Sequence, residues 1–127
     1  MIEKRHRVED ALEAVHSAQQ EGIVPGGGVA IVRASANLEL ELDNEDQEIG
    51  AKIVSEAVKY PIKQMAKNAG ESQDLILYEV LSLHGNDVDM LEVGIIDPAK
   101  VTKAAIQNAV SAVSTLITTN YAIIEND

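Results

Sequence analysis

Apolar residues recur at spacings of three and four along most of the chain, which predicts a succession of amphipathic helices. The first helix is predicted from about Arg5 to Glu21, and Gly22 is its expected end. A second apolar run, "GVAIVRASANLEL", follows a glycine-rich turn. Periodicity alone does not distinguish this run from a strand, and we interpret it as a helix. The apolar face of the first helix comprises Val8, Ala11, Leu12, Val15 and Ala18.

Polar residues divide the middle of the chain into three short helices. Asn44 followed three residues later by Gln47 is a capping-box pattern and predicts the start of the first. Pro61 suits the first turn of the second, and Ser72 is the expected N-cap of the third, which should end near Gly85. The predicted apolar faces contain Ile49, Ile53, Val54 and Ala57, then Ile62, Met65, Ala66 and Ala69, then Leu75, Ile76, Leu77, Val80 and Leu81.

The dipeptide Asp97-Pro98 predicts the start of a long final helix. An acidic N-cap followed by proline at the first helical position satisfies both the backbone geometry and the helix dipole. This helix should run to about Thr118, and "NYAIIE" after it resembles a short terminal strand. The predicted fold is therefore mainly α, a bundle of about six helices with a short C-terminal β-strand.

The amino-acid composition limits the kinds of molecule that the protein is expected to bind. The 127 residues suffice for one domain, and the absence of Phe and Trp means that aliphatic residues must fill the core. Twenty-one acidic against ten basic residues argue against nucleic acid or anionic membranes as partners, and leave proteins, cations and nucleotides held by main-chain groups. The chain has no cysteine, which suits the cytoplasm and excludes disulfides and thiolate sites. No apolar run reaches the roughly 20 residues of a membrane span.

The glycine run Gly26, Gly27 and Gly28 does not fit the regular phosphate-binding motifs. A dinucleotide fingerprint would need glycine where Ile31 stands, and a Walker A loop would need lysine where Gly28 stands. Glycines before a helix can still present N–H groups to an anion. From the residues alone, a structural turn is favoured over a ligand contact.

The charged candidates also have ordinary structural interpretations. Asp10 lies on the flank of the first helix, where an acid is usually a solvated surface residue. For Asp97, a role as an N-cap is favoured over a role in ligand binding. The acidic patch lacks the order of a calcium-binding loop, and the histidines lack metal-ligand spacing, so we expect no metal site. The patch comprises Asp43, Glu45, Asp46 and Glu48, and the histidines are His6, His16 and His84.

Several motifs in a fixed order cover nearly the whole chain. They are "RVEDA", the glycine triplet about fifteen residues later, "NEDQ", and "GIIDPAKVT" before a long helix that ends in "ITT". Each is weak alone, but chance agreement in both sequence and order is improbable. In this combination the chain resembles the last part of a group I (GroEL-type) chaperonin subunit.

The resemblance implies a division into an intermediate-domain-like helix, residues 1–22, and the C-terminal half of the equatorial, nucleotide-binding domain, residues 23–127. It implies that Asp10 helps to activate the water that attacks ATP near Mg²⁺. It further implies that Gly27, with Gly26 and Gly28 beside it, contacts the nucleotide through its backbone. Asp97 would then hydrogen-bond the ribose.

Two departures from the family qualify these expectations. The 127 residues contain neither the family's phosphate loop, G-D-G-T-T, nor the apical domain that binds client proteins. The segment "LHGNDVDMLEVG" is shorter than its family counterpart and lacks a hairpin with an adenine-side contact. We therefore expect this chain alone to bind neither ATP nor Mg²⁺ and not to hydrolyse ATP, since phosphoryl transfer depends on the phosphate and metal clamp.

The same departures leave an alternative function open: a stand-alone helical interaction or oligomerisation module derived from a chaperonin, with no nucleotide role. The expected partners are other chaperonin segments or subunits, including copies of the chain itself. Client proteins would be reached only through an apical domain. A half-domain should expose apolar surface, which favours self-association.

Overall fold

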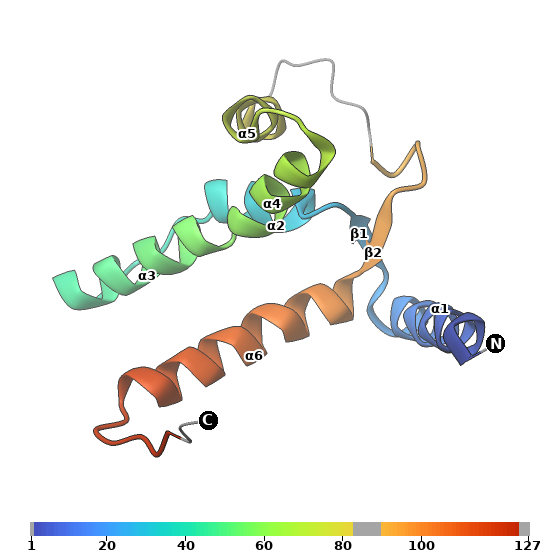
Figure 1. Cartoon of the computed structure of the whole chain (residues 1–127). Helices are drawn as coiled ribbons and strands as arrows, with labels where there is room; N and C mark the ends of the chain where they lie inside the picture. Colours follow the sequence, from blue (N-terminus) through green and yellow to red (C-terminus); the bar gives the residue numbers. More distant parts are fainter. Residues whose placement is uncertain (1, 83–89, 125–127) are drawn as a thin grey trace. The chain divides into compact units, whose positions relative to one another are not determined.

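The computed structural model describes residues 2–82 and 90–124, which form six helices and one two-stranded sheet (Figure 1). This agrees with the predicted mainly helical class. Backbone contacts divide the chain into two compact units. One unit contains Met1–Gly22 together with Pro98–Asp127, and the other contains Ile23–Asp97. We call them the terminal unit and the central unit and describe each by itself.

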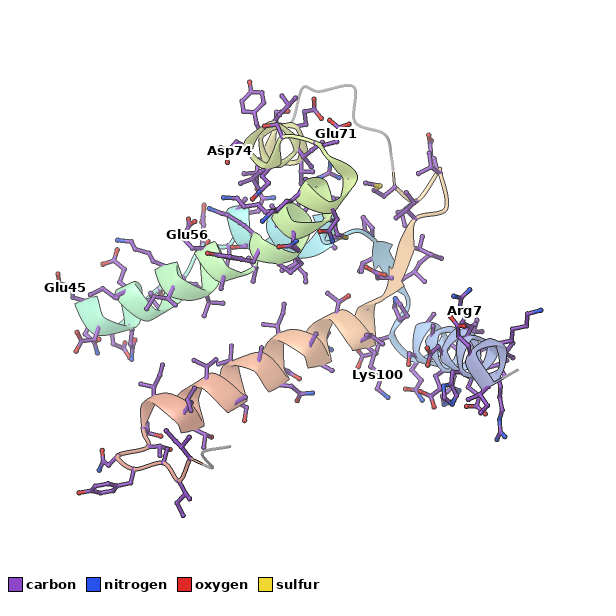
Figure 2. All side chains as sticks on the ribbon, in the orientation of Figure 1. Arg7, Glu45, Glu56, Glu71, Asp74 and Lys100 are labelled. Carbon is purple, nitrogen blue, oxygen red and sulfur yellow. The ribbon has the colours of Figure 1, made fainter. Side chains whose placement is uncertain are left out.

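The terminal unit is a pair of long helices, α1 (Ile2–Glu21) and α6 (Ala99–Ile117), which pack against each other. Gly22 ends α1 in a left-handed conformation with φ of 82°, as predicted, and its carbonyl accepts a hydrogen bond from Ala99 N–H at 3.0 Å. Lys103 Nζ lies 2.8 Å from a Glu21 carboxylate oxygen. Lys100, labelled near the start of α6 in Figure 2, donates from Nζ to the Gln20 side chain. Neither helix contains a buried residue. Polar contacts therefore link the two helices at the end of α1 and the start of α6, and the apolar side chains of the pair are at most half-buried.

The central unit contains four short helices: α2 (Val29–Ala36), α3 (Glu45–Ala57), α4 (Tyr60–Ala69) and α5 (Gln73–Leu81). The predicted cap at Asn44 is confirmed, because its side chain accepts a hydrogen bond from Gln47 N–H at 3.0 Å. The Gln47 side chain accepts from Asp43 N–H at 3.0 Å, one residue earlier than in the usual capping box. These two bonds satisfy N–H groups at the start of α3.

The predicted caps of α4 and α5 are also confirmed. Pro61 occupies the first turn of α4, which ends at Gly70 with φ of 80°. The Ser72 hydroxyl accepts a hydrogen bond from Leu75 N–H at 3.4 Å at the start of α5. The helix ends at Leu81, and Gly85, its expected end, lies outside the described residues.

A small hydrophobic core lies in the central unit. Val29 and Val32 on α2 and Ile62 and Ala66 on α4 are the buried hydrophobic residues of the described chain. Ile76, Leu77, Val80 and Met90 pack partly buried against this cluster. The core forms because α2, α4 and α5 are short enough for their apolar faces to meet around one point.

Three predictions were wrong. No strand forms at residues 121–124, where Tyr121 and Ile123 are almost fully exposed and no described strand pairs with them. The strands instead are β1 (Ile23–Pro25) and β2 (Ile96–Pro98), which pair with each other. Asp97 is not an N-cap: β2 holds it in an extended conformation, which the residue before proline favours, and Pro98 precedes α6. The apolar face of α1 is exposed rather than packed at Val8, Leu12 and Val15.

Candidate functional site

The pairing of β1 with β2 brings the glycine turn beside the strand that contains Asp97. Gly26 N–H donates to the Ile95 carbonyl at 2.9 Å, and Ala99 N–H donates to the Gly22 carbonyl at the other end of the pair. Residue numbers increase from Gly22 to Gly26 along one strand while those of their partners decrease from Ala99 to Ile95 along the other, so the two strands are antiparallel. This register sets Asp97 opposite Val24, two residues from the first glycine. Segments about seventy residues apart in sequence therefore meet within the central unit.

Gly26 is buried, and its backbone lies directly against the partner strand. A Cβ atom at this position would lie 3.0 Å from the Ile95 carbonyl oxygen and 3.1 Å from Ile96 N. These distances are tighter than nine in ten real Cβ contacts, and the neighbouring atoms are backbone atoms, which shift less easily than the end of a flexible side chain. The close approach of β2 therefore favours glycine at position 26.

Gly27 and Gly28 have positive φ values of 68° and 78°, a conformation that side chains disfavour. Both residues are half-buried. Gly28 is the N-cap of α2 and offers no side-chain cap to the first helical turn. The start of α2 thus presents the positive end of the helix dipole next to a backbone without side chains, which is suited chemically to close contact with an anionic or polar ligand.

The Asp97 carboxylate is half-buried, and within residues 2–82 and 90–124 it forms no ion pair or hydrogen bond. Its oxygens can therefore accept hydrogen bonds from a ligand. Asp10 is exposed on α1 and belongs to the terminal unit. Gly26, Gly27, Gly28 and Asp97 thus belong to the same compact unit, in which the glycine turn contacts β2 through Gly26, whereas Asp10 belongs to the other unit.

The chaperonin family model, described as TCP-1/cpn60 chaperonin family, matches residues 1–127. The chain belongs to this chaperonin family. The match spans the same length as the motifs quoted from the sequence, so it includes both the glycine turn and the Asp97 strand. Family membership indicates a role in protein folding and a protein type that assembles into oligomers.

Two further residues next to the turn of this chaperonin chain could not be identified from the sequence. Ile95 supplies the carbonyl that binds Gly26 N–H, and the terminal methyl group of Met90 lies 4.0 Å from where a Cβ of Gly27 would be. No local pattern marks either residue, because their importance depends on a contact with a distant segment. The pairing of β1 and β2 was itself not predicted.

The other candidate positions of the chaperonin chain do not converge on a site. His6 and His16 are exposed, and His84 lies outside the described residues. Where the structure describes the chain, no group of three or more His, Asp or Glu residues could hold a metal ion. The acidic residues Glu45, Asp46 and Glu48 lie in the first turn of α3, where they complement the helix dipole.

None of the described helices is long and apolar enough to cross a membrane.

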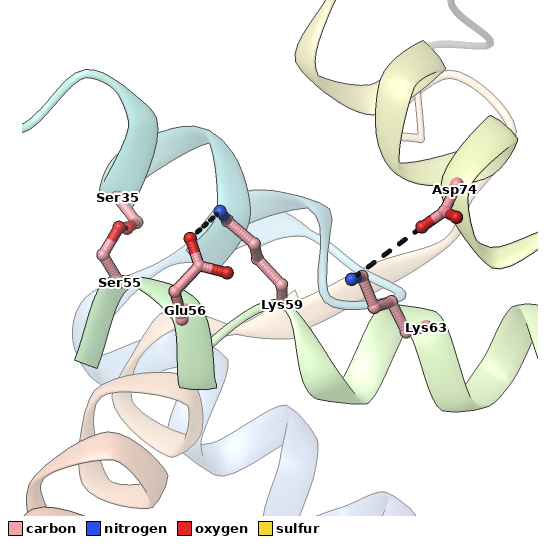
Figure 3. Close-up of polar contacts among 6 residues, drawn as sticks. All are labelled: Ser35, Ser55, Glu56, Lys59, Lys63 and Asp74. Carbon is pink, nitrogen blue, oxygen red and sulfur yellow. Dashed lines mark hydrogen bonds and ion pairs between the residues drawn. The ribbon is translucent and has the colours of Figure 1, made fainter. Parts of the chain in front are cut away.

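Figure 3 shows side-chain polar contacts among the helices of the central unit. Lys59 Nζ donates to a Glu56 oxygen at 2.5 Å, and this hydrogen bond, followed by the charge of the same ammonium, lowers the pKa of Glu56. Lys63 Nζ lies 4.0 Å from an Asp74 oxygen and links α4 to α5. These residues are structural, and the electrostatics of the candidate site come from its backbone and from Asp97.

Proposed function

We propose that this chain is part of a group I (GroEL-type) chaperonin subunit and contributes one side of its ATP site. In this proposal residues 1–22 belong to the intermediate domain and residues 23–127 to the C-terminal half of the equatorial domain. The intact assembly would use ATP and Mg²⁺ to drive protein folding. The chain would supply the nucleotide contacts, and another segment would supply the phosphate and metal clamp.

The observation that supports this proposal most strongly is the antiparallel contact between the glycine turn and β2. The contact places the backbone of the glycine turn on the strand next to β2, which contains Asp97, and the Asp97 carboxylate has no partner among residues 2–82 and 90–124. A nucleotide needs both kinds of group: N–H donors for its polyanionic part and a carboxylate for the ribose hydroxyls. Gly27 would make the backbone contact, and Asp97 would accept the hydrogen bonds of the ribose.

Asp10 would act on the reaction rather than on binding. A carboxylate can accept a proton from, or orient, the water that attacks the γ-phosphate. Its exposed position on α1 leaves the carboxylate accessible. The 127 residues contain no G-D-G-T-T segment, so the charge that develops during phosphoryl transfer must be stabilised by residues from elsewhere. We therefore expect no measurable hydrolysis by this chain alone.

Exposed apolar side chains support an assembly role for the terminal unit. Val8, Leu12 and Val15 on α1 are each more than half exposed, as are Val113, Leu116 and Ile117 on α6. Apolar faces of this extent are typical of surfaces that another protein covers. We propose that other chaperonin segments or subunits, including copies of this chain, pack against them.

Isothermal titration with ATP and Mg²⁺ tests the nucleotide role. We expect no binding by the chain alone and binding after addition of the N-terminal equatorial half of a group I chaperonin. In the reconstituted pair, Asp97→Asn should weaken ATP binding about tenfold or more, because a charge-assisted hydrogen bond is lost. Glu92→Gln, an exposed acid in the turn before β2, is the matched control and should leave binding unchanged. Failure of the two halves to associate would contradict the proposal.

Hydrolysis separates the role of Asp10 from that of Asp97. In the reconstituted pair, Asp10→Asn should lower the ATPase rate by about 10²-fold or more with little change in ATP affinity. The alternative function, an interaction module without a nucleotide role, is favoured by the exposed apolar faces. It predicts that both substitutions leave nucleotide and partner binding unchanged, so the same two variants distinguish the functions.

A further inference from the structure

Two methionine side chains lie against the glycine turn of the central unit. Gly27 and Gly28 have no Cβ and positive φ values, which leaves space beside their backbone. The terminal methyl group of Met65 on α4 lies 3.5 Å from where a Cβ of Gly28 would be, and that of Met90 lies 4.0 Å from the corresponding point of Gly27. Thioether side chains from two segments that are distant in sequence therefore cover consecutive residues of the turn.

The two methionines differ in their access to solvent. Met65 is 43% exposed, although Ile62, three residues earlier on α4, is buried and its Cβ also lies 3.5 Å from the Cβ position of Gly28. Met90 is half-buried and packs against the hydrophobic core. A dissolved oxidant therefore has easier access to Met65 than to Met90.

Met90 is also linked to the turn through the backbone. Its carbonyl accepts a hydrogen bond from Ile95 N–H at 2.8 Å, and the Ile95 carbonyl accepts one from Gly26 N–H at 2.9 Å. A displacement of Met90 can thus reach Gly26 through two successive hydrogen bonds. The side chain and the backbone of Met90 both contribute to the position of the turn.

Methionine is the only sulfur-containing residue type in this chain. The sequence has no cysteine and three methionines, of which Met1 is the third. Hydrogen peroxide oxidises a thioether in a two-electron step, in which the sulfur lone pair attacks one peroxide oxygen and the O–O bond breaks. The sulfur becomes a sulfoxide, and the leaving hydroxide takes up the remaining proton to form water. The product is polar, whereas the thioether is apolar.

We propose that oxidation of Met65 and Met90 to sulfoxides by a hydroperoxide loosens the glycine turn and the start of α2, so that the turn is a redox-sensitive element of this chain. The apolar residues around Met90 supply no hydrogen-bond donor to a sulfoxide oxygen, and burying an unpaired polar atom is unfavourable. The Met90 side chain must then leave the core, or the turn must move. A ligand that contacts the turn loses part of its site, whatever the identity of that ligand.

Peroxide treatment of the whole chain, followed by amide hydrogen exchange, tests the proposal. Mass spectrometry of peptides verifies the sulfoxides, and we expect Met65 to be oxidised faster than Met90. With both oxidised, exchange at residues 26–32 should become about tenfold faster or more, because the unpaired oxygen lowers the free energy of local opening. Exchange in α6 should stay unchanged.

Two results of this experiment would overturn the proposal. Unchanged exchange at residues 26–32 with both sulfoxides present would show that the methionines do not hold the turn. An equal increase in α6 would attribute the effect to general unfolding rather than to the turn.

Leucine variants assign the effect to particular sulfurs. Met65→Leu and Met90→Leu keep an apolar side chain of similar volume that peroxide does not oxidise, so the double variant should lose the whole increase. It still contains Met1, whose oxidation is the matched control and should leave exchange of the turn unchanged. Circular dichroism verifies that the variants remain helical. If the treated double variant exchanges as fast as the treated original chain, the sulfurs at the turn are not responsible and the proposal fails.

Reversal of the oxidation requires no variant. Methionine sulfoxide reductases of both stereospecificities convert the sulfoxides back to thioethers. They should restore the original exchange at residues 26–32 as the mass of the chain returns to that of the untreated protein. A turn that still exchanges fast after the mass has returned would show that peroxide acted through other damage, and the proposal would be wrong.

Discussion

The terminal and central units use the same helical periodicity but bury very different amounts of apolar surface. In the central unit, short helices bring Val29, Val32 and Ile62 into one core. In the terminal unit, α1 and α6 are 20 and 19 residues long and contain no buried residue. An apolar stripe therefore shows only that one face of a helix is suited to burial. The whole stripe is buried only where a second element packs along the full length of that helix. The long stripes of the terminal unit extend beyond the region where the helices meet.

This difference predicts that the central unit contributes most of the stability of the isolated chain. Apolar burial is the main favourable term in folding, whereas exposed ion pairs contribute little. The terminal unit has no fully buried residue, and its two helices are linked by an exposed ion pair of Lys103 with Glu21 and a hydrogen bond from Lys100 to Gln20. Its helices should become stable only when a partner covers their apolar faces.

The largest expected effect comes from removing a core side chain. Ile62→Ala should lower the free energy of unfolding by about 2–5 kcal/mol, because it leaves a cavity among Val29, Val32 and the side chains of α5. Val113→Ala on exposed α6 should change it by less than about 0.5 kcal/mol. Urea denaturation followed by circular dichroism measures both. Equal losses would contradict the contrast between the units.

A smaller effect is expected at the turn that starts the core. Gly28→Ala should destabilise the central unit by about 1–2 kcal/mol, because φ of 78° is unfavourable for any residue with a Cβ. Gly50 lies inside α3, and a Cβ added to it would have no neighbouring atom within 4 Å. Gly50→Ala should therefore stabilise by roughly 0.5–1 kcal/mol, and thermal unfolding of the two variants should shift in opposite directions.

Smaller still is the contribution of the ion pair in the terminal unit. Lys103→Met should cost about 0.2–1 kcal/mol, since both partners are partly exposed. Amide hydrogen exchange should become faster at the end of α1 and stay unchanged in α2 and α4. Lys4→Met, an exposed lysine at the other end of α1, is the control. Faster exchange throughout the central unit would show that the two units are not energetically separate.

The smallest expected effect is on pH dependence. The Lys59 ammonium lowers the pKa of Glu56 below its ordinary value of 4.5, so the pair stabilises the folded state above that pH. The contribution should be lost as pH falls through the lowered pKa of Glu56. Hydrogen exchange at the end of α3 should then increase slightly, and Glu56→Gln should remove this pH dependence. A dependence that persists in Glu56→Gln would assign it to other carboxylates.

The local signals in the sequence predicted the helix boundaries well. Asn44, Pro61 and Ser72 influence only the backbone within a few residues of each, and all three lie in the first turn or at the N-cap of a helix, as predicted. Asp97 was predicted as an N-cap because it precedes a proline, and the same proline is the reason that the prediction was wrong. A residue before proline favours extended backbone, which suits a strand as well as a cap, and pairing with β1 decided between the two.

The candidate site was predictable only in part. The ordered motifs identified Gly26, Gly27, Gly28 and Asp97 as residues of interest, and all four lie in the central unit, where Gly26 pairs with Ile95 of the neighbouring segment. The proposed nucleotide roles of these residues remain predictions, as does that of Asp10. The sequence contained no sign that the Ile95 backbone lies against Gly26, because the two segments meet through a strand pair of only three residues each.

By itself the sequence determined the helical class, the caps at Asn44 and Ser72 and membership of a chaperonin family, because these depend on local backbone preferences and on ordered motifs. Tertiary structure alone decided which apolar faces are buried and which residues meet. Burial requires a second surface at the right distance, and strand pairing requires a partner segment, and both can come from anywhere in a chain. For this reason Val32 is buried and Leu12 is exposed, although both lie on apolar stripes with the same periodicity.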